Sequence, residues 1–139
     1  MPTNIRPELS RKNKYWLERH RYYELKHFCL QYDLWKKERS NLDLSLMPTP
    51  NYTETHKPLY KVDATAWFSE KRIFYTNRID MVERAAKLTD SCLGSYILKA
   101  VTRGLSYDIL RVNFEIPCCK EVYYELYRKF FWILDRERG

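Results

Sequence analysis

The sequence predicts an all-α protein with a helical N-terminal segment, a long central helix and a C-terminal unit of three helices. Glycine and proline are scarce, at 3 and 6 of 139 residues, which leaves little material for the tight turns of β-hairpins. Apolar residues make up 45% of the chain and aromatic residues 16%, which is enough to form a core. Apolar side chains also recur at helical spacing through long stretches without Gly or Pro. Together these observations favour a bundle of helices.

Length and composition also exclude several classes of protein. A chain of 139 residues fits one ordinary domain and excludes a large multidomain enzyme. No run approaches 18 apolar residues, and the start of the chain, MPTNIRPELSRKNK, lacks the apolar stretch of a signal peptide. We therefore expect a cytoplasmic protein without a membrane partner.

Cysteine spacing argues against a metal site. The four cysteines are Cys29, Cys92, Cys118 and Cys119. None of them forms a CxxC pair, and no histidine lies three or four residues from a cysteine, so the spacing of a structural zinc site is missing. Small buried thiols in a reducing compartment explain these residues best. We predict no disulfide, no metal and no cofactor.

Residues 1–42 form the predicted N-terminal segment, which is basic, aromatic and helical. From Lys14 onward the segment contains no Gly or Pro, and we expect one break around Gln31–Asp33, where Asp33 would cap a second short helix. One helical face is predicted to consist of Trp16, Arg19, Tyr23 and Leu30. Residues 1–40 hold ten Lys or Arg and five Asp or Glu, so most of the net charge of +7 lies here.

The middle of the chain divides into a linker and a long helix. Residues 43–58 contain three prolines and no helical period, which predicts an extended linker or a surface loop. Residues 59–88 carry the strongest helical signal of the chain. Apolar residues recur there at every seventh position, namely Trp67, Phe74, Met81 and Leu88, with Phe68, Tyr75 and Val82 beside them. We favour core packing for this wide apolar face, and a dimer seam remains the alternative.

Residues 89–139 predict three helices separated by short turns. Asp90 is expected to cap the first helix, whose Ile97, Leu98 and Val101 point inward, and Gly104 ends it. Ser106 caps a short helix at Tyr107–Phe114, with Ile109, Leu110 and Phe114 inward. Pro117 precedes the third and longest helix, where Tyr123, Tyr127, Phe130 and Leu134 form one core stripe.

A short helix, a brief turn and a longer helix form the pattern of a helix-turn-helix. In that arrangement the back of the last helix packs on the two before it, and the front enters the major groove of DNA. The residues predicted to lie opposite the core stripe are Lys120, Glu121, Tyr124, Glu125 and Arg128. Lysine and arginine bind phosphates or guanine edges, and a tyrosine hydroxyl reaches a phosphate. The amides at the start of this helix, residues 118–120, also favour a phosphate.

The C-terminal sequence resembles a known group of regulators. The stretches ILKAVTRGLSYDIL and IPCCKEVYYELYRKFF are similar to the ends of RinA- and ArpU-type late-gene regulators from phages of Gram-positive bacteria. Those ends are similar to the DNA-binding C-terminal domain of sigma factors. The resemblance covers roughly the second half of the chain and implies that Lys120, Tyr124, Arg128 and Lys129 face DNA. The N-terminal block is outside this group's pattern and resembles uncharacterised prophage proteins.

A second candidate surface lies in the N-terminal segment, where cations alternate with aromatic rings. The cations expected to form a patch for the DNA backbone or an acidic partner are Lys14, Arg19, Arg21 and Lys26. We favour a core role for the rings of Trp16, Tyr23 and Phe28. Alternatively, the rings of Tyr15, Trp16, Tyr22 and Tyr23 stack on single-stranded bases.

Catalysis has weak support. His20, Glu24 and His27 have the spacing of one helical face, but no nucleophile or third ligand accompanies them, and the HExxH order of metalloproteases is absent. We predict that the protein is not an enzyme.

The leading hypothesis is a phage-derived, sequence-specific DNA-binding transcriptional regulator in the cytoplasm of the host bacterial cell. Its partner would be double-stranded DNA, and a homodimer would read two half-sites. The alternative is a small phage inhibitor of a host protein, of the anti-CRISPR type, that blocks a nucleic-acid-handling nuclease. Glu121 and Glu125 on the reading face, together with the basic N-terminal segment, suit that alternative.

Overall fold

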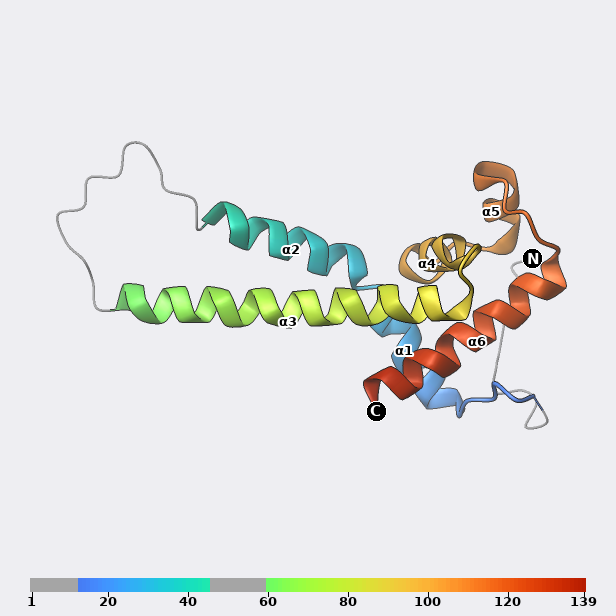
Figure 1. The fold of residues 1–139 in the computed structure, drawn as a ribbon, viewed down its shortest axis with the longest axis horizontal. Coiled ribbons are helices and arrows are strands. Elements are labelled where there is room, and N and C mark those ends of the chain that lie inside the picture. Colours follow the sequence, from blue (N-terminus) through green and yellow to red (C-terminus); the bar gives the residue numbers. More distant parts are fainter. Residues whose placement is uncertain (1–12, 46–59) are drawn as a thin grey trace.

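The computed structural model describes residues 13–45 and 60–139, and every regular element in them is a helix. The six helices are α1 (Arg19–Cys29), α2 (Tyr32–Ser45), α3 (Tyr60–Thr89), α4 (Gly94–Arg103), α5 (Tyr107–Phe114) and α6 (Lys120–Arg138). The predicted all-α fold is therefore confirmed. In Figure 1, α2 lies beside the first part of α3 as a projecting arm, while α1, α4, α5 and α6 gather around the other end of α3.

The core sits where the second half of α3 meets α1, α4 and α6. Ile79 and Val82 of α3 are 1% and 0% exposed, and Phe130 and Phe131 of α6 are both 0% exposed. Leu25 of α1 joins them in the same cluster. Each fully buried side chain of this size contributes about 1.5–3 kcal/mol to folding, so this junction of helices carries most of the stability.

The N-terminal segment differs from its prediction in three ways. Residues 14–18 are not helical, and α1 begins at Arg19. The break falls at residues 30–31, so Asp33 lies in the first turn of α2 and is not its cap. Helix α2 continues through Ser45, into the range predicted as linker; residues 46–59 of that range lie outside the described residues, as do residues 1–12.

The helical face predicted from Trp16, Arg19, Tyr23 and Leu30 is not the face that α1 buries. The buried residues of α1 are Tyr22, Leu25, Phe28 and Cys29, whereas Leu30 is 41% exposed and Trp16 precedes the helix. Among the three rings assigned to the core, Phe28 is buried, and Trp16 and Tyr23 are half-buried. The face is rotated because α1 packs against α6, whose Phe131 ring lies 5.2 Å from that of Tyr22.

The long central helix is confirmed, but only part of its predicted core face is buried. Val82 of that face is fully buried, and Tyr75 and Met81 are half-buried against the core. Helix α3 ends at Thr89, one residue beyond the prediction. Trp67, Phe74 and Leu88 are 50%, 40% and 55% exposed, and the buried face consists of Ile79, Val82, Ala85, Ala86 and Thr89. Among the described residues, α2 is the helix that packs along most of the first half of α3 (Figure 1), which leaves Trp67 and Phe74 half or nearly half exposed.

The predicted end of α4 and the predicted cap of α5 are confirmed, whereas Asp90 is not the N-cap of α4. The carboxylate of Asp90 accepts hydrogen bonds from the amides of Cys92 and Leu93 at 2.8 and 2.7 Å, so it caps the turn before α4; the N-cap of the helix is Leu93, which makes no side-chain cap hydrogen bond. Gly104 ends α4 with φ 66°, in the left-handed region that favours glycine. The hydroxyl of Ser106 accepts from the amide of Ile109 at 3.3 Å, which caps α5.

One residue predicted to point inward on α5 is exposed, whereas the predicted core stripe of α6 is buried. Ile109 is 40% exposed, because α5 is a short helix that buries only Tyr107 and Leu110. The core stripe of α6 is confirmed at all four positions, and Phe131 joins it. Helix α6 packs mainly along α3 and α1, rather than on α4 and α5 as the helix-turn-helix prediction requires.

Candidate nucleic-acid interface

The turn between α5 and α6 is held by four backbone and side-chain features. Glu115 ends α5 with φ 53°, and the amide of Ile116 donates to the carbonyl of Leu110 at 3.2 Å. The side chain of Ile116 is 6% exposed. The hydroxyl of Tyr107, on the first turn of α5, donates to the carbonyl of Cys118 at 2.6 Å. These contacts fix the start of α6 relative to α5.

The predicted DNA-facing residues occupy the first three turns of α6 but differ in exposure. Lys120 is exposed, and its ammonium lies 5.6 Å from the centroid of the Tyr124 ring. Tyr124, Arg128 and Lys129 are half-buried. Arg128 and Lys129 form no ion pair with any residue from 13–45 or 60–139. The charge of Lys129 lies close enough to Asp90 to help lower the pKa of that carboxyl, so Arg128 is the more available of the two cations to a ligand.

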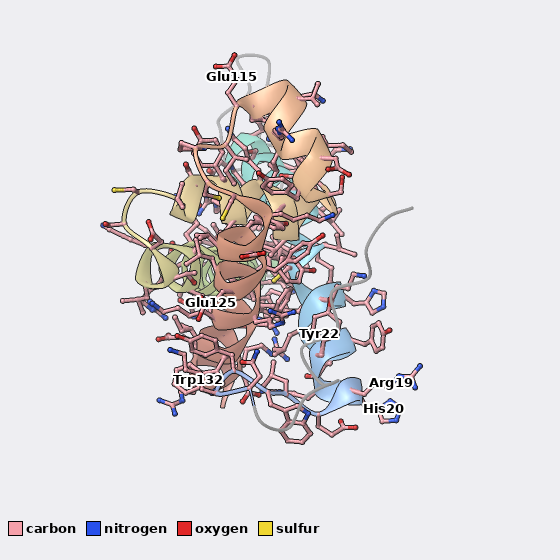
Figure 2. All side chains as sticks on the ribbon, turned by 90° about the vertical axis from the view of Figure 1, so that its right-hand side faces the viewer. Arg19, His20, Tyr22, Glu115, Glu125 and Trp132 are labelled. Atoms are coloured by element: carbon pink, nitrogen blue, oxygen red, sulfur yellow. The ribbon has the colours of Figure 1, made fainter. Side chains whose placement is uncertain are left out.

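Two acidic residues lie among these cations. Glu121 and Glu125 are both exposed, and Figure 2 shows Glu125 on the outward side of α6, facing the viewer. A carboxylate at this position repels phosphates and accepts a hydrogen bond from the amino group of cytosine. The outer side of α6 therefore carries mixed charge, with Lys120 at its start.

A groove beside the start of α6 adds one cation that the sequence analysis missed. This groove, about 610 Å³ in volume, is lined by Tyr107, Asp108, Arg111, Ile116, Cys118, Cys119 and Lys120. Arg111 is exposed in the last turn of α5, so it and Lys120 flank the groove from two helices. The sequence around Arg111 contains no signal for it, because on a helix it lies on the same side as Tyr107, which is buried.

Only some of the cations in the basic patch predicted on the N-terminal segment are available to bind a ligand. The guanidinium of Arg21 donates to the carboxylates of Asp135 at 2.6 Å and Glu24 at 3.1 Å. These hydrogen bonds raise the pKa of Arg21 and use its charge to join α1 to α6. Lys14 and Arg19 are exposed, and Lys26 is half-buried.

The patch and the predicted DNA-facing residues lie toward opposite ends of α6. Tyr15, next to Lys14, packs edge-on against Trp132 at 5.5 Å, in the second half of α6. Figure 2 shows Arg19 and Trp132 both toward the lower end of the view, with Glu115 at its top. Lys120 starts the helix, and twelve residues of α-helix span about 18 Å. The structure does not bring the two sets of cations together.

The residues considered for catalysis do not form a site. Glu24 binds Arg21 and also Arg138, at 3.3 Å, while His20 and His27 are exposed. In the described parts of the chain, no group of three or more His, Cys, Asp or Glu side chains is placed to hold a metal ion. All four cysteines are free thiols, and burial raises the pKa of Cys29.

Over residues 13–45 and 60–139, no helix has both the length and the apolar character of a membrane span. No protein-family model, no curated protein and no solved structure matches this chain.

Proposed function

We propose that the protein is a phage-derived, sequence-specific DNA-binding transcriptional regulator that binds double-stranded DNA through the first turns of α6. One observation carries the proposal: the Tyr107–Cys118 hydrogen bond of 2.6 Å fixes the start of α6, where Lys120 is exposed. A helix that enters the major groove must present its first turns in one orientation, and this bond supplies such a constraint.

The cations divide into two roles. Lys120 and Arg111 flank the groove at the start of α6 and bind phosphates, which position the protein on the duplex. Arg128 lies two turns farther along α6, where its guanidinium donates to a guanine edge. Tyr124 and Lys129 add a hydroxyl and a second charge along the same turns.

The exposed carboxylates of Glu121 and Glu125 support sequence-specific binding over indiscriminate binding. Each repels the backbone of any duplex, which weakens non-specific affinity. Each also accepts a hydrogen bond from cytosine, which rewards particular base pairs. We expect modest affinity for random DNA and a clear preference for a selected sequence.

Selection of duplexes from a random library, followed by fluorescence anisotropy, tests this proposal. The double variant Lys120→Ala, Arg128→Ala should bind the selected duplex at least about tenfold more weakly, because each lost charged contact is worth roughly 1–3 kcal/mol. The matched control, Lys36→Ala with Lys37→Ala, removes the same charge from exposed positions on α2 and should change affinity little. Unchanged affinity of the first variant for every duplex would show that α6 is not the reading helix.

A second candidate function is inhibition of a host protein, of the anti-CRISPR type. It is favoured by the exposure of Glu121 and Glu125, because two carboxylates on one helix suit a basic protein surface, including the nucleic-acid channel of a nuclease. A pull-down from nuclease-treated host lysate separates the two functions. Retention of a nuclease without bound DNA supports inhibition, and light scattering with and without duplex DNA reports whether a homodimer forms.

A further inference from the structure

A pocket lies where the corner between α1 and α2 meets the middle of α3 and the last turn of α6. Its volume is about 420 Å³, within the usual range of small-molecule sites. In Figure 1 the C-terminal end of α6 lies beside α1, close to α3. The residues that line the pocket are Phe28, Gln31, Leu34, Trp35, Glu38, Phe74, Tyr75, Arg78 and Arg138.

Two arginines line this pocket, and the guanidinium of each already stacks on a phenylalanine ring. The guanidinium carbon of Arg78 lies 3.5 Å from the centroid of the Phe74 ring, and that of Arg138 lies 3.9 Å from the centroid of the Phe28 ring. Stacking of this kind uses the face of a guanidinium and leaves the N–H groups at its edge free to donate. Paired N–H groups at such an edge match the oxygens of a carboxylate or phosphate.

The donors of these arginines are incompletely satisfied. The Nε of Arg138 is buried and finds no acceptor among the described residues, although its Nη2 binds Glu24 at 3.3 Å. Arg78 forms no hydrogen bond or ion pair within the described part of the chain. Because the Nε of Arg138 is closed to solvent, an anion in the pocket would be stabilised by the unpaired N–H groups of Arg78 and by the charge of both guanidiniums.

The charges around the pocket are consistent with an anion site. Burial and the nearby charge of Arg138 lower the pKa of Arg78, which reflects two cations held close together. Glu38 is the acidic residue that lines the pocket; it forms no ion pair with any described residue. A bound anion would offset the repulsion between the arginines.

We propose that this pocket binds a small oxyanion, a carboxylate or phosphate carried on a planar apolar ring, with the oxygens between Arg78 and Arg138. The ring would lie against Leu34, which is 52% exposed, and the edge of Phe74, which is 40% exposed. Trp35, only 3% exposed, closes the floor.

A small ligand fits this surface better than a nucleic-acid strand does. Base stacking needs open ring faces, but the ammonium of Lys71 lies 5.8 Å from the Trp67 ring and 5.3 Å from the Phe74 ring, and Arg78 covers Phe74 as well. The pocket also lies about 27 Å from Lys120, since α6 has 19 residues. The site is therefore independent of the proposed DNA contact.

Isothermal titration calorimetry with phenyl phosphate and benzoate tests the proposal, with benzyl alcohol as the uncharged analogue and inorganic phosphate as the ringless one. Phenyl phosphate and benzoate should bind, benzyl alcohol should not, and inorganic phosphate should bind several-fold more weakly than phenyl phosphate. Arg78→Gln should weaken binding at least about tenfold, as expected for loss of charged hydrogen bonds. Glu38→Gln should strengthen binding, because it removes a like charge from the site.

The decisive variant is Arg78→Gln, because Arg138 also pairs with Glu24 and its loss perturbs the contact between α1 and α6. Circular dichroism checks that Arg78→Gln remains folded, and Arg103→Gln, an exposed position outside the pocket, is the matched control. The absence of heat with both ring-bearing anions at millimolar concentration would overturn the proposal. So would equal affinity of wild type and Arg78→Gln, and equal affinity for phenyl and inorganic phosphate would overturn the role of the ring.

Discussion

Replacing Gly94 with alanine should destabilise the protein, although Gly94 lies in a helix where alanine is normally preferred. Gly94 is the first residue of α4 and is buried. A Cβ atom built on it would lie 2.6 Å from the carbonyl oxygen of Ala86, near the end of α3. That oxygen belongs to the backbone and already accepts from the amide of Asp90 at 3.4 Å. The methyl group therefore requires α3 and α4 to move apart.

The expected loss in free energy of unfolding is the difference between two opposing effects of the substitution. Overpacking at a close backbone contact costs about 1–3 kcal/mol, and alanine recovers up to about 1 kcal/mol of helix propensity. A net loss of about 1–2 kcal/mol corresponds to a fall in Tm of roughly 3–7 °C for a chain of 139 residues. Local propensity alone predicts a change of the opposite sign.

Thermal unfolding followed by circular dichroism measures this difference. Ser95→Ala is the matched control, because Ser95 is the next residue of α4 and is exposed, so its stability should stay within about 0.5 kcal/mol of wild type. A Gly94→Ala protein with a Tm equal to or above that of wild type would refute the close contact between α3 and α4.

Three further predictions concern single residues, each measured by urea unfolding. Glu115→Gly should stabilise the protein by about 0.5–1 kcal/mol, because φ is 53° there and glycine adopts such angles without strain; a lower urea midpoint would contradict this. Two backbone amides at 2.7 and 2.8 Å lower the pKa of Asp90 from its usual 3.8, so wild type should exceed Asp90→Asn in stability above pH 3.8 and lose that advantage as the pH falls below it. A constant difference across that range would contradict the assignment. Phe130→Ala should cost about 3–5 kcal/mol and Trp67→Ala about 1 kcal/mol or less, because their side chains are 0% and 50% exposed; similar losses would mean that Trp67 is buried in solution.

Several predictions that depended on neighbouring residues in the chain were accurate, although the predicted cap at Asp33 was not. Ser106 caps α5 and Gly104 ends α4 at the predicted positions, since capping involves groups within three or four residues of one another. The core stripe of α6 from Tyr123 to Leu134 is also correct. A helix with one strongly apolar face has a single orientation that buries it.

Predictions that depended on distant neighbours failed. The aromatic residues of α3 recur every seven positions, yet Trp67 and Phe74 are exposed, because, in the part of the chain that the structure describes, mainly α2 packs along the first half of that helix. Arg21 was placed in a surface patch, but it binds Asp135, 114 residues away in the chain, at 2.6 Å. Spacing along one helix identifies neither the helix that packs against α3 nor the carboxylate that binds Arg21.

The residues of the candidate sites also differ in whether the sequence predicts them. Lys120, Tyr124 and Arg128 follow from the periodicity of α6 and its preceding turn, whereas Arg111 joins Lys120 only because α5 folds back beside the start of α6. The pocket between Arg78 and Arg138 draws on four helices, and no segment of the sequence contains a signal for it.

The sequence by itself determined the helical fold, most of the helix ends and the inner face of α6, because hydrogen bonds and apolar spacing within a few residues specify them. Only the tertiary structure decided which face of α3 is buried, which cations are neutralised and where two arginines meet. Those outcomes depend on which helices lie against each other, and a side chain's burial and charge environment are set by neighbours from remote parts of the chain.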